Sequence, residues 1–269
     1  MKKISHGGNI YKKAKEMGIR EEDILDFSAN ISPLGLPEHI RKAMIEAIDG
    51  TINYPDPDCS RLKEAISKQD NVPESHITCG NGGADLLYRL AFGLHPKKVL
   101  LPAPAFVEYE EALSAAGAQM EYYLMRDDFV IKEDILEQIT EETDFVVICN
   151  PNNPTGILTE KELILRVLER AKETNTFVMA DECFLEICQN ESEYTVKPFI
   201  EKYENLIILK SFTKLYAIPG VRLGYILAGS EDVIAKVNRT GQAWSVSHIA
   251  QCAGVAALSD NVYKERVIE

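Results

Sequence analysis

Five short, mostly apolar runs recur along the chain, and each is four or five residues long. Their apolar residues stand at consecutive positions rather than at every second one, which is typical of strands buried on both faces of a parallel sheet. We therefore predict strands at residues 98–101, 145–149, 177–180, 206–209 and 224–228.

Segments with helical spacing separate these runs. In residues 159–173 apolar side chains recur every three or four positions, and Thr159 followed by Glu162 predicts a capping box at the start of the helix. Strands that alternate with helices predict an α/β fold with a largely parallel sheet. Further helices are predicted at 83–94, 106–116 and 133–139, and from near His248 to the end of the chain.

Composition limits the class of protein. The 269 residues are 45% hydrophobic and 26% charged, which suits one large domain, or one large and one small, and excludes a disulfide miniprotein or a wholly disordered chain. Lys and Arg number 29 and Asp and Glu 42, so the net charge is −13. Such a surface disfavours nucleic acids and anionic membranes as partners, whereas a small anion can bind in a locally positive pocket.

The distribution of apolar stretches and cysteines bears on location. No apolar stretch approaches the roughly 20 residues of a membrane helix, and the first residues lack the apolar run of a signal peptide. The six cysteines are scattered, with no Cys-x-x-Cys pair and no His at metal-site spacing. We expect reduced thiols in a cytoplasmic protein without a metal site.

Polar residues follow several of the predicted strands, at the sheet edge where α/β proteins bind ligands. Taken singly, each has a structural explanation as a turn, a cap or a surface charge. Together they form an ordered series: Gly80–Gly83, the segment 150–156 with Asn153-Pro154-Thr155-Gly156, Asp181, Ser211-Phe212-Thr213-Lys214 and Arg222.

The order and spacing of this series resemble those of the fold-type I enzymes that depend on pyridoxal 5′-phosphate, the aspartate aminotransferase superfamily. Asn153 and Asp181 are 28 residues apart, Asp181 and Lys214 are 33 apart, and Lys214 and Arg222 are 8 apart. The resemblance extends from about residue 24 to the end of the chain. It implies a three-layer α/β/α sandwich with a mostly parallel central sheet, and pyridoxal 5′-phosphate as the cofactor.

The resemblance also implies a role for each residue that holds the cofactor ring. Lys214 matches the lysine that forms the Schiff base with the cofactor aldehyde. Asp181 matches the carboxylate that keeps the ring nitrogen protonated, and Asn153 matches the donor to the ring oxygen. Phe106 takes the place of the aromatic side chain that stacks on the ring, with plain core packing as the alternative.

The cofactor phosphate and the second subunit account for the remaining matches. Phosphate contacts are implied for Ser211, Thr213 and Arg222, with backbone N–H groups of Gly82 and Gly83 at a helix start. Tyr54 resembles the tyrosine that reaches the cofactor phosphate of a neighbouring subunit, which implies a homodimer with shared active sites. A surface Tyr-Pro turn is the alternative for Tyr54.

Two subfamilies compete for the reaction. His6-Gly7-Gly8-Asn9 and the segment around Asn30 look like the L-threonine-O-3-phosphate decarboxylases of cobalamin biosynthesis, in which His6, Asn30 and Asn153 would face the phosphorylated amino-acid substrate. Phe184 stands where many aminotransferases have tyrosine, which also fits a decarboxylase. A histidinol-phosphate or related class I/II aminotransferase is the alternative. A non-catalytic regulator is disfavoured because Lys214, Asp181 and Arg222 are all present and no basic DNA-binding segment is seen.

The resemblance finally predicts a domain division. Residues 1–45 match an N-terminal arm and small-domain segment, and residues 46–269 match the large cofactor-binding domain. Family chains continue into a C-terminal small-domain segment that carries a substrate-binding arginine, and that segment is largely absent from these 269 residues. The chain is expected to be either a truncated product or an incomplete part of a longer chain. We expect this chain on its own to hold the cofactor site but to bind substrate weakly. Loss of the charged contact would reduce the free energy of substrate binding by roughly 2–5 kcal/mol.

Overall fold

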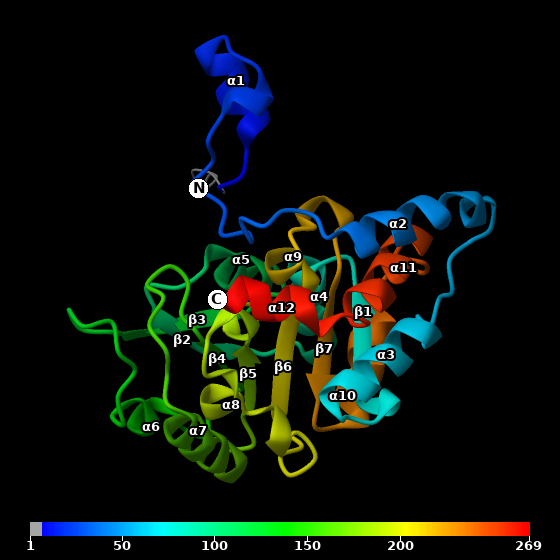
Figure 1. Ribbon diagram of the computed structural model, residues 1–269. Helices are drawn as coiled ribbons and strands as arrows, with labels where there is room; N and C mark the ends of the chain where they lie inside the picture. Colours follow the sequence, from blue (N-terminus) through cyan, green and yellow to red (C-terminus); the bar gives the residue numbers. More distant parts are fainter. Residues whose placement is uncertain (1–6) are drawn as a thin grey trace.

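A seven-stranded sheet forms the centre of the computed structural model, which describes residues 7–269 (Figure 1). The strand order is β1-β7-β6-β5-β4-β2-β3. β7 runs antiparallel to both of its neighbours and the other neighbouring pairs are parallel, which confirms the mostly parallel sheet. The strands are β1 (Ile77–Gly80), β2 (Lys98–Ala103), β3 (Gln119–Leu124), β4 (Phe145–Cys149), β5 (Phe177–Asp181), β6 (Leu206–Ser211) and β7 (Gly224–Ala228).

Helices cover both faces of this sheet and complete the three layers. Leu62 of α3 and Val167 of α7 pack on one face, while Leu90 of α4 and Val237 of α10 pack on the other. The helices are α1 (Ile10–Met17), α2 (Glu38–Glu46), α3 (Ser60–Asp70), α4 (Gly83–Leu94), α5 (Val107–Ala115), α6 (Ile135–Gln138), α7 (Lys161–Glu173), α8 (Glu191–Tyr194), α9 (Phe212–Leu215), α10 (Glu231–Thr240), α11 (His248–Ala257) and α12 (Asn261–Ile268).

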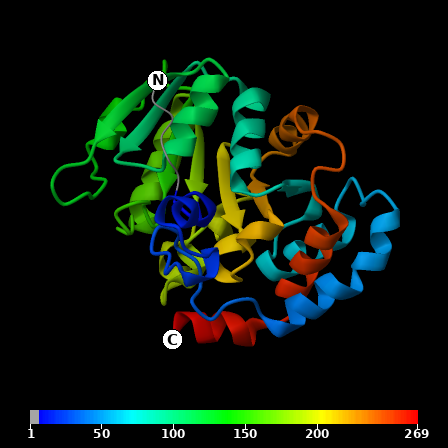
Figure 2. The same cartoon turned by 90° about the horizontal axis from the view of Figure 1, so that it is seen from above.

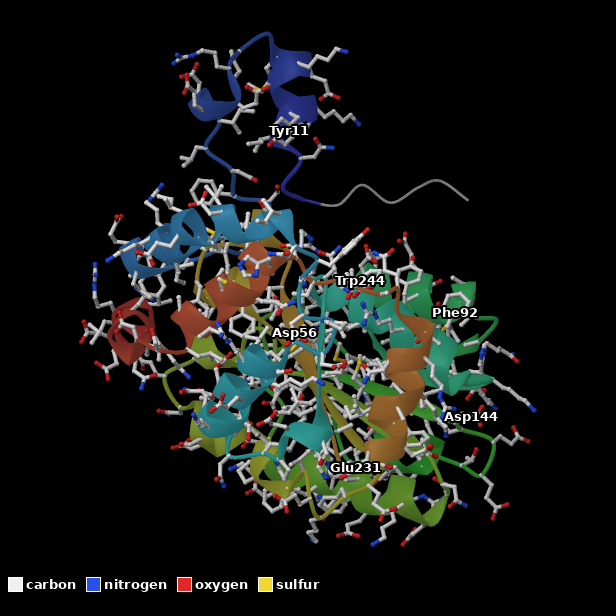
Figure 3. The ribbon with its side chains drawn as sticks, turned by 90° about the vertical axis from the view of Figure 1, so that its right-hand side faces the viewer. Tyr11, Asp56, Phe92, Asp144, Glu231 and Trp244 are labelled. Carbon is white, nitrogen blue, oxygen red and sulfur yellow. The ribbon has the colours of Figure 1, made fainter. Side chains whose placement is uncertain are left out.

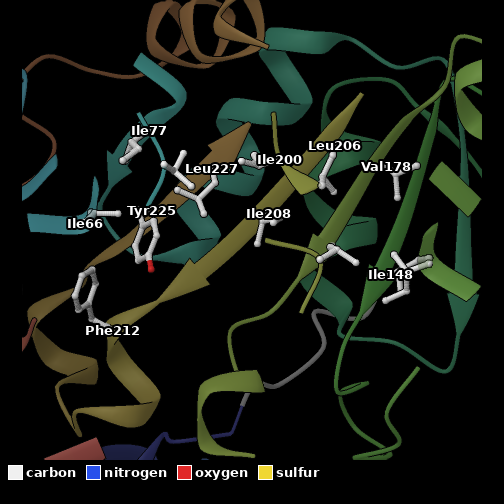
Figure 4. Close-up of a cluster of buried hydrophobic side chains, with 14 of the residues drawn as sticks. Ile66, Ile77, Ile148, Val178, Ile200, Leu206, Ile208, Phe212, Tyr225 and Leu227 are labelled. Atoms are coloured by element: carbon white, nitrogen blue, oxygen red, sulfur yellow. The ribbon is translucent and has the colours of Figure 1, made fainter. Parts of the chain in front are cut away.

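The predicted apolar runs form the middle of the sheet. Ile148 of β4, Val178 of β5, Ile208 of β6 and Leu227 of β7 are fully buried in one cluster (Figure 4). These strands are covered on both faces, so consecutive residues point into two different apolar layers. Burial on both faces explains why the runs lack the alternation of a half-exposed strand.

Two helix predictions are wrong in detail. α7 begins at Lys161 without a side-chain cap, because Thr159 is held elsewhere: its N–H donates to Asn150 Oδ1 (2.9 Å) and its carbonyl accepts from Asn150 Nδ2 (3.0 Å). The last helix is not continuous either. α11 ends at Ala257, and Asp260 caps a separate α12 by accepting a hydrogen bond from the N–H of Val262.

The N-terminal segment leaves the body of the molecule and returns to it. α1 stands above the sheet layers, and the segment that follows it runs back toward α2 (Figures 1 and 2). On the way, Ser32 Oγ lies 3.0 Å from the hydroxyl of Tyr263, which donates to the carbonyl of Gly35 at 2.7 Å. The segment is thereby attached to α12. Within residues 7–269, no helix has the length and apolar character needed to cross a bilayer.

Candidate active site

A cavity of about 590 Å³ opens where β4, β5 and β6 end. It forms there because the parallel strands bring their carboxyl ends, and the polar residues that follow them, to one edge of the sheet. Asn30 from the N-terminal segment also reaches it. Nine residues predicted from the sequence line this one cavity: Asn30, Gly83, Phe106, Asn153, Asp181, Ser211, Thr213, Lys214 and Arg222.

Lys214 enters the cavity from the short helix α9. Ser211 caps this helix by accepting a hydrogen bond from the N–H of Thr213, and the carbonyl of Lys214 accepts from the N–H of Ser32 at 3.0 Å. Burial lowers the pKa of Lys214, and the positive charge of Arg222 also acts in that direction. A lowered pKa leaves more of the amine neutral, the form in which lysine acts as a nucleophile.

Asp181 ends β5 and is only 6% exposed. Its Oδ2 accepts a hydrogen bond from the hydroxyl of Tyr109 (2.6 Å), and its Oδ1 accepts from the N–H of Cys183 (2.9 Å). Both donors are neutral, and no Lys, Arg or His of the described chain lies within ion-pair distance of this carboxylate. A buried carboxylate without a cation is costly, so the site fits a ligand that brings a positively charged N–H.

Glycine is required beside Arg222. Gly82 has φ +88°, and a Cβ built on it would lie 2.6 Å from Arg222 Nη2. Gly82 precedes Gly83, where the twelve-residue helix α4 begins. The N-terminal N–H groups of a helix and a guanidinium together favour an anion such as a phosphate.

Two hydroxyl groups lie on the same side of the cavity. Ser211 Oγ and Thr213 Oγ1 are 2.8 Å apart and both residues line the cavity. Each hydroxyl can donate to one partner and accept from another. The pair can therefore turn its protons toward a bound anion next to Arg222.

Phe106 and Asn153 complete the part of the lining that the sequence predicted. Phe106 precedes α5, and its ring lies edge-to-face on the ring of Tyr109 with centroids 5.6 Å apart. Asn153 follows β4 and also lines a second cavity of about 420 Å³. The two cavities share Asn30, Asn153, Pro154 and Phe184, so they adjoin. No charged side chain lines the second cavity within residues 7–269.

Of the predicted residues that the structure describes, Tyr54 and Gly82 do not line the cavity. Tyr54 is 79% exposed and stacks on Trp244 outside it, with ring centroids 4.5 Å apart. His6 lies outside the described residues. Gly82 is adjacent to the lining through its contact with Arg222.

Tyr109 and Cys183 belong to the site although no role was predicted for them from the sequence. Tyr109 is the third residue of α5, and Cys183 follows Asp181 by two residues. Helical spacing does predict that a residue three positions after Phe106 returns to the same face. The contact with Asp181, however, joins residues 72 positions apart, which no local pattern reveals.

Comparison with known proteins places the chain in a family. The model of the aminotransferase class I and II family matches residues 22–267. The threonine-phosphate decarboxylase of Salmonella typhimurium is 36% identical over 97% of this chain and 72% of its own length. Histidinol-phosphate aminotransferase 2 of Ralstonia nicotianae is 34% identical over 98% of this chain and 70% of its own length.

A solved structure agrees with this assignment. The histidinol-phosphate aminotransferase from Clostridium acetobutylicum superposes with a TM-score of 0.85 at 30% identity, covering 91% of this chain and 72% of that one. These matches confirm the predicted fold, the predicted class of enzyme and the dependence on pyridoxal 5′-phosphate. The chain belongs to the aminotransferase class I and II family.

Proposed function

We propose that this chain acts on a phosphorylated amino acid and that its reaction is the decarboxylation of L-threonine O-3-phosphate. The observation that carries the cofactor chemistry is the buried carboxylate of Asp181, which has no cationic partner in the described chain and shares a cavity with Lys214. The choice of reaction rests on two curated relatives named threonine-phosphate decarboxylase or putative threonine-phosphate decarboxylase, at 36% and 35% identity.

The residues of the cavity suit the cofactor. When bound, pyridoxal 5′-phosphate supplies an electron sink for the bond that breaks at the substrate's Cα. Asp181 would keep the ring nitrogen protonated, Asn153 would donate to the ring oxygen, and Phe106 would stack on the ring. Arg222, Ser211 and Thr213, together with the N–H of Gly83, would hold the phosphate. The N–H of Gly82, which was also expected to contribute, donates to the carbonyl of Gly80 at 2.8 Å.

Lys214 has two tasks in this proposal. Its amine, whose lowered pKa favours the neutral form, would hold the cofactor covalently. The same amine, when free, would give or take the proton at the substrate's Cα as a general acid or base. The hydrogen bond from the N–H of Ser32 to the Lys214 carbonyl fixes the backbone from which this side chain extends.

The N-terminal segment is assigned to the substrate. Gly7, Ser28, Ala29 and Asn30 line the main cavity, and Asn30 also lines the second one. We propose that Asn30, Asn153 and His6 contact the substrate. Lys214 and Arg222 are the cations that the described chain contributes to the two linings, and both are assigned to the cofactor. A substrate anion then needs a charged partner from outside these linings, and the resemblance provides one in the arginine of the C-terminal small-domain segment.

The surface beside the cavity suits a homodimer. Tyr54 and Trp244 stack on each other while remaining 79% and 47% exposed, and Ile52 nearby in sequence is 88% exposed. Figure 3 labels Trp244 among the side chains of this view. Exposed aromatic and aliphatic side chains of this kind mark contact surfaces between proteins. We propose that Tyr54 extends to the phosphate site of the partner subunit. An Ile52→Asp variant that stays dimeric in sedimentation experiments would contradict this interface.

Two further assignments remain proposals. We propose the cytoplasm as the location. We also propose residues 1–45 as an arm and small-domain segment and 46–269 as the large domain; this boundary falls in the last turn of α2, which packs against α11.

An aminotransferase is the second candidate, because relatives named histidinol-phosphate aminotransferase match at 29–36% identity and a solved structure of that name matches at 30%. One experiment separates the two. Protein loaded with the cofactor is incubated with L-threonine O-3-phosphate and CO₂ is measured, while a parallel sample receives histidinol phosphate and 2-oxoglutarate and glutamate is measured. CO₂ without glutamate supports the decarboxylase; glutamate without CO₂ overturns it in favour of the aminotransferase.

A further inference from the structure

A phenol–carboxylate contact lies at the floor of the main cavity. The hydroxyl of Tyr109 donates to Asp181 Oδ2 at 2.6 Å, and Tyr109 is only 1% exposed. The same ring packs edge-to-face against Phe106, with the two planes at 85°. One side chain therefore contacts two of the three residues that we assign to the cofactor ring, Asp181 and Phe106.

Tyr109 remains a hydrogen-bond donor in this setting. Burial and the negative charge of Asp181 both raise the pKa of the phenol, so it keeps its proton over the physiological range. A short hydrogen bond to an ionised acceptor is stronger than one between neutral groups. Both oxygens of the Asp181 side chain thus accept a hydrogen bond, Oδ1 from the N–H of Cys183 and Oδ2 from the phenol.

We propose that Tyr109 is a positioning residue that aims the Asp181 carboxylate, and the Phe106 ring, at the ring of the cofactor. This inference rests on the proposed function, since it assigns Asp181 to the ring nitrogen. It adds a residue to the site and states how that residue acts: the phenol stabilises the anionic form of Asp181, so the shared proton stays on the ring nitrogen.

This role of Tyr109 requires that its hydroxyl affects where the proton between Asp181 and the ring nitrogen resides. Without the phenol, Asp181 becomes the stronger base and draws the proton away from the ring nitrogen. The ring is then a weaker electron sink, so turnover falls while substrate affinity is kept. A purely structural role for Tyr109 would instead lower stability and leave the protonation of the ring nitrogen unchanged.

The test uses Tyr109→Phe, which keeps the ring and its packing and removes only the hydroxyl. We expect kcat to fall about tenfold or more, with KM changed less than about twofold, from the loss of one hydrogen bond to a charged group. The nitrogen-15 chemical shift of labelled pyridoxal 5′-phosphate reports the protonation of the ring nitrogen directly. We expect this signal to move toward the unprotonated form in the variant.

A matched control exists elsewhere in the chain. Tyr123 is also buried and also donates from its hydroxyl to a carboxylate, Asp134 Oδ1 at 2.5 Å, but neither residue lines the cavity. Tyr123→Phe removes the same kind of hydrogen bond and should leave kcat and the nitrogen-15 signal unchanged. A double variant with Asp181→Asn provides the second control, because a residue that acts through Asp181 should have no further effect once that carboxylate is gone.

The outcomes separate this inference from the proposed function. Tyr109→Phe behaving like Tyr123→Phe, or adding its full effect to that of Asp181→Asn, would overturn the positioning role while the cofactor site stands. Wild-type protein that shows no cofactor absorbance in saturating pyridoxal 5′-phosphate would overturn both. If neither substrate is turned over, the nitrogen-15 signal still decides the role of Tyr109.

Discussion

A methyl group on Gly82 would stand 2.6 Å from Nη2 of Arg222. Gly82 also has φ +88°, a conformation that side chains other than glycine rarely adopt. The glycine therefore lets the backbone at the start of α4 and the guanidinium approach one another. Because this is the arrangement that we assign to the cofactor phosphate, its geometry can be tested by a single methyl group.

We predict that Gly82→Ala weakens binding of pyridoxal 5′-phosphate by about tenfold or more, since displacing Arg222 removes a hydrogen bond to a charged group. Titration of the apoprotein by absorbance measures this. Gly117→Ala is the control: Gly117 has φ +92° but no atom within 4 Å of its built Cβ. Both variants carry the backbone strain of roughly 1 kcal/mol or more, so equal cofactor affinities in the two would contradict the assignment of Arg222.

The second prediction concerns the pH at which the cofactor attaches. Burial, assisted by Arg222, sets the pKa of Lys214 below the usual lysine value of about 10.4. Only the neutral amine attacks an aldehyde, so attachment should rise with pH and reach half its maximum below that value. Arg222→Met removes a positive charge, which should raise the Lys214 pKa and move the midpoint to higher pH.

The absorbance of the lysine-bound cofactor provides the measurement, and Lys214→Ala provides the control. This variant should lose the absorbance at every pH. If the absorbance survives in Lys214→Ala, another amine carries the cofactor and the assignment of Lys214 is wrong. If the midpoint in Arg222→Met stays where it is in the wild type, Arg222 does not act on Lys214 through its charge.

The predicted strands, β2 and β4 to β7, are apolar runs buried on both faces, whereas the edge strand β1 (Ile-Thr-Cys-Gly) was not predicted although all four of its residues are buried. β4, β5, β6 and β7 are continuous apolar runs. Because their ends could be located in the sequence, the polar residues that follow them could be predicted as site candidates. β3 is an edge strand with the sequence Gln-Met-Glu-Tyr-Tyr-Leu, and most of its residues are partly or fully exposed. Because only one of its neighbours is a strand, its composition is not that of a buried run, and the sequence did not predict it.

The parts of the site that could not be predicted depend on long-range contacts. Thr159 has the residue type of a helix cap, yet the side chain of Asn150 binds its backbone and the helix begins later. Tyr109 acts through a residue 72 positions away. Tyr54 resembles a phosphate ligand but lies outside the cavity of its own chain, so a role for it requires a second subunit.

The third prediction separates substrate binding from cofactor binding. Ser28 Oγ accepts from the N–H of Gly8 at 2.7 Å and donates to Asp26 at 2.6 Å. These hydrogen bonds join the two ends of the N-terminal segment that contains α1. Ser28→Ala should remove the link between the two ends of the segment and raise KM about threefold to tenfold, as expected for one neutral hydrogen bond. The cofactor spectrum should stay the same. Ser259→Ala, which removes an exposed hydroxyl bonded to the carbonyl of Ala256, should change neither.

A rise in KM accompanied by loss of the cofactor would contradict this assignment, because the N-terminal segment would then be supporting the cofactor itself. An unchanged KM would show that the segment does not contact substrate. Both results can be read from the same steady-state assay combined with the absorbance of the bound cofactor.

The fourth prediction concerns a buried group of charges on the other face of β6. Lys210 is fully buried, and its Nζ lies 3.5 Å from Glu186 and 3.7 Å from Glu191. Asp70 pairs with Lys197 at 2.7 Å and accepts a hydrogen bond from the hydroxyl of Tyr225 at 2.7 Å. The charge of Lys210 also lowers the pKa of Asp70. Removing the cation leaves buried carboxylates uncompensated. Lys210→Met should therefore lower the free energy of unfolding by about 3–5 kcal/mol.

Chemical denaturation measures this loss, with Lys236→Met as the control. Lys236 pairs with Asp232 at 2.7 Å on the surface, where both side chains are exposed. Removing an exposed pair should cost less than about 1 kcal/mol. Equal losses in the two variants would show that burial does not strengthen the role of Lys210.

The loss in Lys210→Met should also depend on pH in a definite direction. Burial favours the neutral acid at Asp70 and Glu191, but the charge of Lys210 and its neighbouring lysines outweighs it, so both pKa values lie below their usual range in the wild type. That stabilisation is present above about pH 4 and is lost as the pH falls through the lowered values. In Lys210→Met, burial raises the pKa values of Asp70 and Glu191, so these carboxyl groups take up protons at a higher pH than in the wild type. The difference in stability between the two proteins should therefore be largest near pH 7 and shrink in acid, and a difference that grows in acid would rule out charge as its cause.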